Sequence, residues 1–314
     1  MLSKDSQHSA AASLPPVSIP SSPAFAGAIC VPPPDTLVTD YAWAKAEAAK
    51  AGNLYPVLND WRRRRKNVSS REWNPVLLAF QASRQTVLYT LSAADIVHVA
   101  RTTEHALGDV QSWEKDLDDN MFAEKLSPTY AVVMLLHDLL ESIGRVPTWG
   151  DFEDFLFDRQ DLCLQYFMRA GQIPALASRS QMWAHPRMRA VRWRMANFYY
   201  SFLKEIHIIV SLRRTHGLDV RYHPLLDAEW KADFVCGDVR GELFFSNRKY
   251  RAATSGRKTP CGKLNPGLPV VTMLVEKRSK YGECWLYKDA VIAELAQKVR
   301  EQDGPSIPSF ILPS

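Results

Sequence analysis

Four side chains in the C-terminal half, Glu205, Asp233, Asn247 and Lys249, are of the types that bind a metal ion and act on a phosphate. Asp233 lies on one predicted strand, and Asn247 and Lys249 close the next. Residues two apart on a strand share a face, so both point toward the acid on the neighbouring strand. This almost forms a metal-dependent phosphodiesterase site, because carboxylate and amide oxygens suit Mg²⁺ and lysine adds positive charge. Where a second carboxylate is expected, the chain has Asn247.

The elements that must position these residues follow Pro186. A long helix is predicted at about 187–215 and contains Glu205, and a final helix is predicted at about 289–302. Between them the predicted strands are DVRYHP, WKADFVC, GELFFSNRKY, VVTMLVE and CWLY. A helix leading in and another closing predict a mixed sheet covered by helices.

Upstream of this region the apolar spacing is helical, in segments such as NPVLLAFQASRQTVLYTL and PTYAVVMLLHDLLESIG. Helix starts are predicted at Ser92 with Asp95 and at Ser127 with Pro128, and helix ends at Gly52, Gly108 and Gly144. We therefore predict a disordered, proline-rich tail at 1–36, an all-α domain at 37–185, an α/β domain at 186–303 and a C-terminal tail at 304–314. The fold class is α+β.

The order of Glu205, Asp233, Asn247 and Lys249 resembles the PD-(D/E)xK, or restriction-endonuclease-like, superfamily, over about residues 187–302. The resemblance implies a restriction-endonuclease-like mixed sheet flanked by helices. It also implies that Glu205, Asp233 and Asn247 ligate a divalent ion, Mg²⁺ or Mn²⁺, and that Lys249 orients or activates the attacking water. Catalytic roles then fall on all four residues.

The chain departs from the motif at two positions. Ala232 replaces its proline, and Asn247 replaces its acid, although superfamily members with Gln at that position are active. Glu242 is a further acid on the same strand, but its even parity sets it opposite Asn247 and Lys249. Glu205 is the better source of the missing charge.

Charge is divided unevenly along the chain. Residues 186–314 contain 22 Lys and Arg against 13 Asp and Glu, a net charge of +9, whereas the first 185 residues contain 17 against 21 and are at −4. No acid occurs between Leu243 and Val275. We predict nucleic-acid binding by the basic residues Arg248, Arg251, Arg257, Lys258 and Lys263, and by Arg62, Arg63, Arg64 and Arg65 in WRRRRK. The alternative for the basic loop is a solvated surface, and the alternatives for WRRRRK are a solvated helix end or a contact with RNA or a partner protein.

The segment MLLHDLLESIGRVPTWGDFEDFLF has helix-turn-helix spacing, with a stop at Gly144 and a second helix starting near Thr148. The alternative is a pair of packed helices, which the acidic character of the second helix favours because an acidic helix is poorly suited to a major groove.

The cysteines, Cys30, Cys163, Cys236, Cys261 and Cys284, form no CxxC pair or zinc-finger pattern. No apolar run approaches the roughly 18 residues that span a bilayer, and the first thirty residues lack a signal-peptide core. We expect a cytoplasmic protein with reduced cysteines and no membrane partner.

These observations lead to one hypothesis with two alternatives. The first is a metal-dependent DNA endonuclease that works with partner proteins in a mobile-element, transposition or phage-defence complex. One alternative is a nuclease-derived protein that has lost catalysis and binds nucleic acid or scaffolds an assembly. The other is an all-α adaptor with an unrelated α+β domain, which would bind neither metal nor DNA.

Overall fold

A computed structural model of the chain describes residues 37–52, 77–107, 131–159, 180, 184, 186–245, 260–275 and 278–303. Residues from Leu37 onward form one compact unit, and the boundary predicted at residue 186 lies inside it. Buried apolar side chains of the described residues belong to one core cluster that extends from Ala44 to Val299. The fold is a mixture of helices and small sheets, so the α+β class is confirmed.

The region predicted to be all-α is mostly helical but contains a small sheet. Its helices include α1 (Tyr41–Lys50), α4 (Ala93–Thr102), α6 (Ala131–Ile143) and α7 (Trp149–Asp158), with the 3-10 helix η1 (Val87–Tyr89). Strands β1 (Thr39–Asp40) and β2 (Arg84–Gln85) pair antiparallel. The all-α prediction was therefore wrong at these four residues, because two-residue strands are too short to show a period-two pattern.

Helix boundaries at Ser92, Gly144 and Thr148 follow the local chemistry that predicted them, whereas the start predicted at Ser127 with Pro128 and the end predicted at Gly108 lie outside the described residues. Ser92 and Asp95 form a capping box at the start of α4, in which each side chain accepts a hydrogen bond from the other residue's backbone N–H. Thr148 caps α7 in the same way. Gly144 follows α6 with a φ of 71°, a left-handed conformation that glycine adopts without a Cβ clash.

Helix α10 (Pro186–Arg214) is the long helix that the sequence predicts, and it carries Glu205. Its residues Ile206 to Leu212 are all buried, on every side of the helix, because other elements surround it. It packs against α4, α6, α14 (Asp289–Asp303) and the strands β3 (Val220–Arg221) and β8 (Cys284–Tyr287). Glu205 is thereby placed in the interior.

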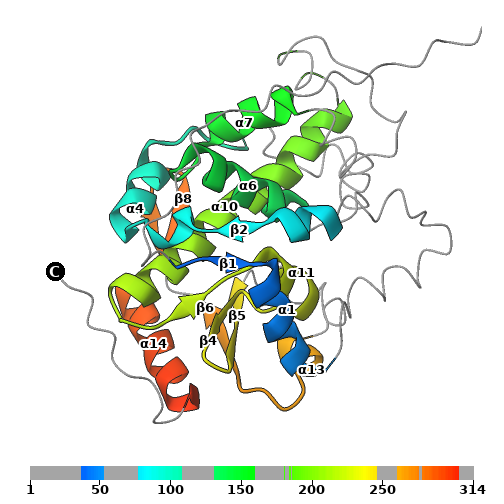
Figure 1. Cartoon of the computed structure of the whole chain (residues 1–314). Coiled ribbons are helices and arrows are strands. Elements are labelled where there is room, and N and C mark those ends of the chain that lie inside the picture. Colours follow the sequence, from blue (N-terminus) through cyan, green and yellow to red (C-terminus); the bar gives the residue numbers. More distant parts are fainter. Residues whose placement is uncertain are drawn as a thin grey trace, which may run out of the picture. The chain divides into compact units, whose positions relative to one another are not determined.

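The main sheet has the strand order β3-β4-β5-β6, with β4 at Phe234–Cys236, β5 at Val239–Phe245 and β6 at Val270–Val275. The first three strands are antiparallel, and β6 is parallel to β5 (Figure 1). The connection from β5 to β6 includes the short helix α13 (Cys261–Leu264). Helix α14 contacts β5 and β6. The predicted sheet with a closing helix is therefore present.

Three details of the predicted strands were wrong. Residues 224–230 form helix α11 (Pro224–Trp230), so the strand predicted as DVRYHP is limited to Val220–Arg221 and WKADFVC is a strand only from Phe234. Asp233 therefore precedes β4. An unpredicted strand, β7 (Arg278–Tyr281), pairs with β8 in a separate antiparallel hairpin.

None of the helices described here is long and apolar enough to cross a membrane.

Candidate metal site

Three acidic side chains from different elements converge in the structure. They are Glu205 of α10, Asp227 of α11 and Asp233 in the loop before β4, and one carboxylate oxygen of each lies within 4.8 Å of the others. Glu205 is buried, and the two aspartates are half-buried. Ligand oxygens on opposite sides of one divalent ion lie about 4 to 5 Å apart, given bond lengths of roughly 2.0 to 2.6 Å. The cluster has the dimensions of a single cation site.

Local structure fixes the two aspartates. His223 is the N-cap of α11, where its Nδ1 accepts a hydrogen bond from the backbone N–H of Leu225 at 3.1 Å, and Asp227 follows in the first turn. The Asp233 carboxylate accepts a hydrogen bond from the backbone N–H of Leu243 at 2.5 Å. The loop that carries Asp233 is thus tied to β5. Each acid is held by a backbone interaction that does not depend on a metal.

Electrostatics at the cluster are unfavourable for the protein alone. Burial raises the pKa of Glu205 well above its usual range, and the nearby charges of Asp227 and Asp233 raise it further. Its Oε1 is buried and has no hydrogen-bond partner among the described residues. Leaving a buried polar atom without a partner costs about 1–3 kcal/mol. A cation would neutralise the charge and supply the absent partner.

Two tyrosines lie beside the carboxylates. The pKa of Tyr222 is raised well above its usual range by burial and by the charges of Glu205, Asp227 and Asp233. The pKa of Tyr287 is raised by burial, by Asp233 and by Glu205. Both phenols therefore remain protonated at neutral pH and are hydrogen-bond donors. The buried Tyr222 hydroxyl has no partner among the described residues.

Tyr222 is held in place from the N-terminal half of the chain. Its backbone N–H donates to the Tyr89 hydroxyl at 2.9 Å, and its carbonyl accepts from the hydroxyls of Thr39 and Tyr89 at 2.6 and 3.2 Å. Helix α6 contributes His137, whose ring stacks on that of Tyr222. Residues from both predicted domains thus support one site.

Glu242 lies near the cluster but is not part of it. Its Oε2 accepts a hydrogen bond from the backbone N–H of Cys261 at 3.1 Å. Burial raises the pKa of the Cys261 thiol to about 12, and the charges of Glu242 and Asp233 contribute to that shift. Glu242 therefore anchors the start of α13, one of its oxygens being already engaged.

The structure brings together two of the four predicted catalytic residues, Glu205 and Asp233. The other two, Asn247 and Lys249, lie outside the described residues, as do most of the predicted basic contacts: Arg62, Arg63, Arg64, Arg65, Arg248, Arg251, Arg257 and Lys258. Lys263 is described and is exposed on α13. Asp227 was missed by sequence reasoning. Pro224 at the first position of a helix was the available indication of α11.

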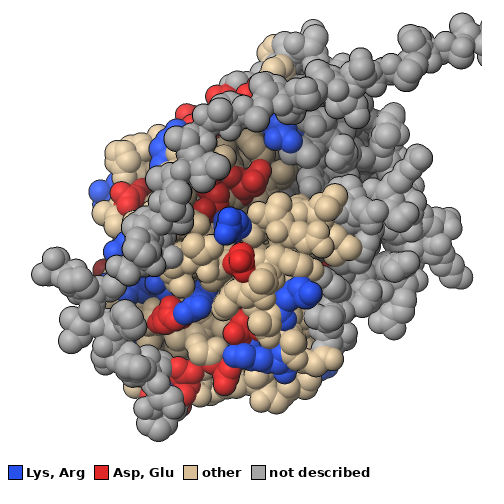
Figure 2. Space-filling view, in the orientation of Figure 1, with Lys and Arg blue, Asp and Glu red and all other residues tan. Residues whose placement is uncertain are grey.

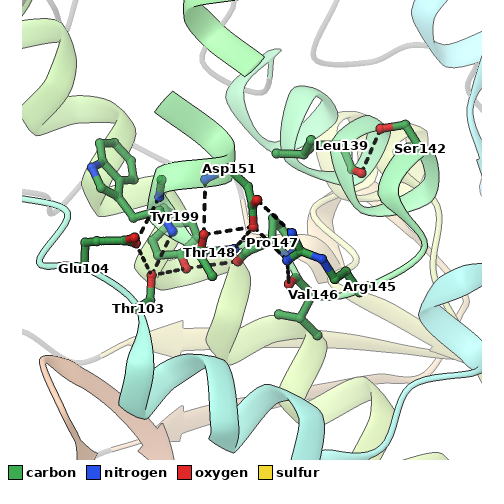
Figure 3. A network of polar contacts seen from close by, with 12 residues as sticks. Thr103, Glu104, Leu139, Ser142, Arg145, Val146, Pro147, Thr148, Asp151 and Tyr199 are labelled. Atoms are coloured by element: carbon green, nitrogen blue, oxygen red, sulfur yellow. Dashed lines mark hydrogen bonds and ion pairs between the residues drawn. The ribbon is translucent and has the colours of Figure 1, made fainter. Parts of the chain in front are cut away.

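The predicted helix-turn-helix segment forms α6 and α7, and its second helix is closed at its N-terminus. The first three backbone N–H groups of α7 donate to the hydroxyl of Thr103, the carboxylate of Glu104 and the hydroxyl of Thr148, at 2.7, 3.0 and 3.1 Å (Figure 3). The Tyr199 hydroxyl donates to the carbonyl of Pro147 just before them. An N-terminus occupied by the chain's own groups supports the packed-helix alternative.

The described surface on the face in Figure 2 carries both signs of charge, with blue and red residues interspersed. Several of the described cations are paired with acids. Lys50 contacts Asp238 at 2.7 Å, and Arg213 contacts Asp219 at 2.9 Å.

No family model matches the chain, and neither the curated proteins nor the solved structures include one with significant similarity to it.

Proposed function

We propose that Glu205, Asp227 and Asp233 bind a divalent cation, Mg²⁺ or Mn²⁺, and that the protein is a metal-dependent DNA endonuclease. The observation that carries this proposal is the convergence of the three carboxylates around a buried glutamate oxygen without a described partner. Like charges at this separation raise the free energy of the folded state unless a proton or a cation compensates them. The oxygen donors favour a hard cation.

The arrangement of elements supports a restriction-endonuclease-like fold. A leading helix, α10, carries the glutamate, and Asp233 immediately precedes the second strand of the sheet. The third strand, β5, lies beside it, and the chain continues from Phe245 toward Asn247 and Lys249. This is the order in which the superfamily places its metal ligands. In this chain, Asp227 supplies a carboxylate that Asn247 does not.

The proposed chemistry is hydrolysis of a phosphodiester bond by water, which gives a phosphate monoester and a hydroxyl. A divalent ion at such a site lowers the pKa of bound water and neutralises charge on the phosphate. The hydrogen bond from Leu243 holds the Asp233 carboxylate, and the His223 cap orders the helical turn that carries Asp227. The protonated hydroxyls of Tyr222 and Tyr287 provide donors for a phosphate oxygen or a water molecule, and both can act at neutral pH.

A plasmid-cleavage assay in Mg²⁺ and Mn²⁺ tests the proposal. We expect nicking or linearisation by the wild-type protein and loss of at least about 100-fold in rate for Glu205→Gln and for Asp233→Asn, typical of removing a metal ligand. Asp238→Asn is the matched control, because Asp238 is an exposed acid in the turn between β4 and β5 and pairs with Lys50. Equal cleavage by all variants would reject the site.

The inactive alternative gives a different pattern. A nuclease-derived binding protein would bind DNA with steep salt dependence in the presence of EDTA and would not cleave it under any metal condition. In that case Glu205→Gln and Asp233→Asn would leave DNA binding unchanged.

A further inference from the structure

The hairpin of β7 and β8 exposes an indole ring. Trp285 is 45% exposed and is one of two large hydrophobic residues exposed in the described part of the chain, the other being Leu78. Its neighbours Cys284 and Leu286 are buried, so this part of β8 alternates between an inner and an outer face. Trp285 is on the outer face and does not contribute its full ring to the core.

Two basic residues of β7 lie on the same face of the hairpin as the exposed ring. Lys280 is the direct cross-strand partner of Trp285. The guanidinium of Arg278, two residues before Lys280 on the same face, lies 5.9 Å from the centroid of the indole. Lys280 is half-exposed, and its ammonium lies 3.7 Å from the carboxylate of Glu283, which is also half-exposed. An exposed aromatic ring beside basic residues is the combination that binds unpaired nucleotides, since the ring stacks on a base and the cations contact phosphates.

The same hairpin packs against the helix that carries Glu205, because β8 contacts α10. Tyr287 lies two residues after Trp285 on β8 and is the cross-strand partner of Arg278. The pKa of Tyr287 is raised by burial and by the charges of Asp233 and Glu205, and Arg278 lowers it. Residues two apart on a strand are separated by about 6.6 Å, so Trp285 lies about that distance along β8 from Tyr287. The exposed ring is therefore on a strand that adjoins the helix of Glu205.

We propose that Trp285, Arg278 and Lys280 form a stacking platform for an unpaired nucleotide of the DNA strand that enters the carboxylate cluster. This inference rests on the proposed function, and it adds that the substrate has a single-stranded segment beside the scissile phosphate. Base stacking on Trp285 requires an unstacked base, which a closed duplex does not offer. Arg278 and Lys280 attract the backbone of either form.

Fluorescence anisotropy with a labelled oligothymidine and with a duplex tests the platform in EDTA, without cleavage. We expect Trp285→Ala to weaken single-strand binding by about 5- to 100-fold, the effect of removing one stacked base, and to change duplex binding less than about twofold. Trp285→Phe keeps a ring and restores most of the affinity. Leu78→Ala, at the other exposed hydrophobic residue, has no effect on either probe.

Salt titrations distinguish the contribution of Arg278 and Lys280 to binding from that of the Trp285 ring. Arg278→Gln and Lys280→Gln each lower the slope of log affinity against log salt by about one, for single strand and duplex alike, whereas Trp285→Ala leaves the slope unchanged. Unchanged single-strand affinity in Trp285→Ala, or equal losses on both probes, would overturn the platform. Failure of the metal site would instead appear in a Mn²⁺ titration, because strand binding is measured here in EDTA.

Discussion

The imidazole of His137 stacks on the phenol ring of Tyr222, with ring centroids 4.3 Å apart and planes at 21°. His137 belongs to α6, and the Tyr222 hydroxyl lies beside the carboxylate cluster. The His137 Nδ1 also lies 2.8 Å from Oε1 of Gln85, on β2. Helix α6, which precedes α10 in the sequence, thus contacts Tyr222 beside the candidate site, and a perturbation at His137 should reach the acids through Tyr222.

Protonation of His137 gives the first prediction. Burial lowers its pKa to about 3, so between pH 6.5 and pH 3 the unfolded state binds more protons than the folded state. The stability it contributes is complete above pH 6.5 and is lost as pH falls toward 3, about 2 kcal/mol being lost at pH 5. Urea unfolding between pH 5 and 7 should show a shallower pH dependence for His137→Phe than for wild type. Identical slopes would contradict this interpretation.

The effect of Glu205 on the pH dependence of stability has the opposite sign to that of His137. Its raised folded pKa means that the folded state retains a proton that the unfolded state has released, so metal-free stability falls as pH rises above the unfolded pKa, about 4.3. Glu205→Gln resembles the protonated acid and should stabilise the metal-free protein at pH 8 by about 1–3 kcal/mol, the range for relief of an uncompensated buried group.

Thermal melts at pH 5.5 and pH 8 measure the Glu205→Gln effect, with Asp238→Asn as the exposed control. Added Mn²⁺ should raise the melting temperature of wild type more at pH 8 than at pH 5.5, because metal binding requires the deprotonated acid. A variant less stable than wild type at pH 8 would show that Glu205 is not destabilised in the folded protein.

The cap of α11 should control Asp227. His223→Ala removes a buried ring whose Nδ1 accepts from Leu225 and whose Nε2 lies 3.3 Å from the Ser83 carbonyl oxygen, so it should cost about 1–3 kcal/mol of stability. It should also weaken Mn²⁺ binding, because Asp227 lies in the turn that the cap orders. Asn is a strong N-cap residue, so His223→Asn should restore much of both properties. Equal Mn²⁺ affinity in wild type and His223→Ala would show that the cap does not position Asp227 for metal binding.

Close packing in the β4–β5 hairpin gives a backbone prediction. A Cβ on Gly241 would overlap the ring of Phe234, its cross-strand partner, whereas a Cβ on Gly262 in α13 would meet nothing within 4 Å. Gly241→Ala should therefore destabilise the protein by about 1–3 kcal/mol, as overpacking does, and Gly262→Ala should be neutral or stabilising. Chemical denaturation of the two variants compares them directly, and equal midpoints would exclude the clash.

Sequence patterns predicted the elements whose signals are local and repeated. The long apolar stretch around Glu205 is α10, and Thr148 and Gly144 mark helix ends in the structure. Helix α11 was missed because seven residues give too few turns for a periodic pattern, and histidine is an unusual cap. Strand β7 was missed because RSKY has one apolar side chain, and its pairing with β8 decides its conformation.

The candidate site was predicted in part for the same reason. Glu205 and Asp233 followed from the order of a helix and two strands. Asp227 could not be placed without the turn between β3 and β4, in which α11 brings it back toward α10. The roles of Asn247 and Lys249 remain predictions.

Isothermal titration of the metal-free protein with Mn²⁺ at pH 8 tests the central claim most directly. We expect one ion per chain in wild type and in Asp238→Asn, and a loss of at least about tenfold in affinity for Asp227→Asn, the acid that only the structure places at the site. Absence of Mn²⁺ binding by wild type, or equal affinity in Asp227→Asn, would contradict it.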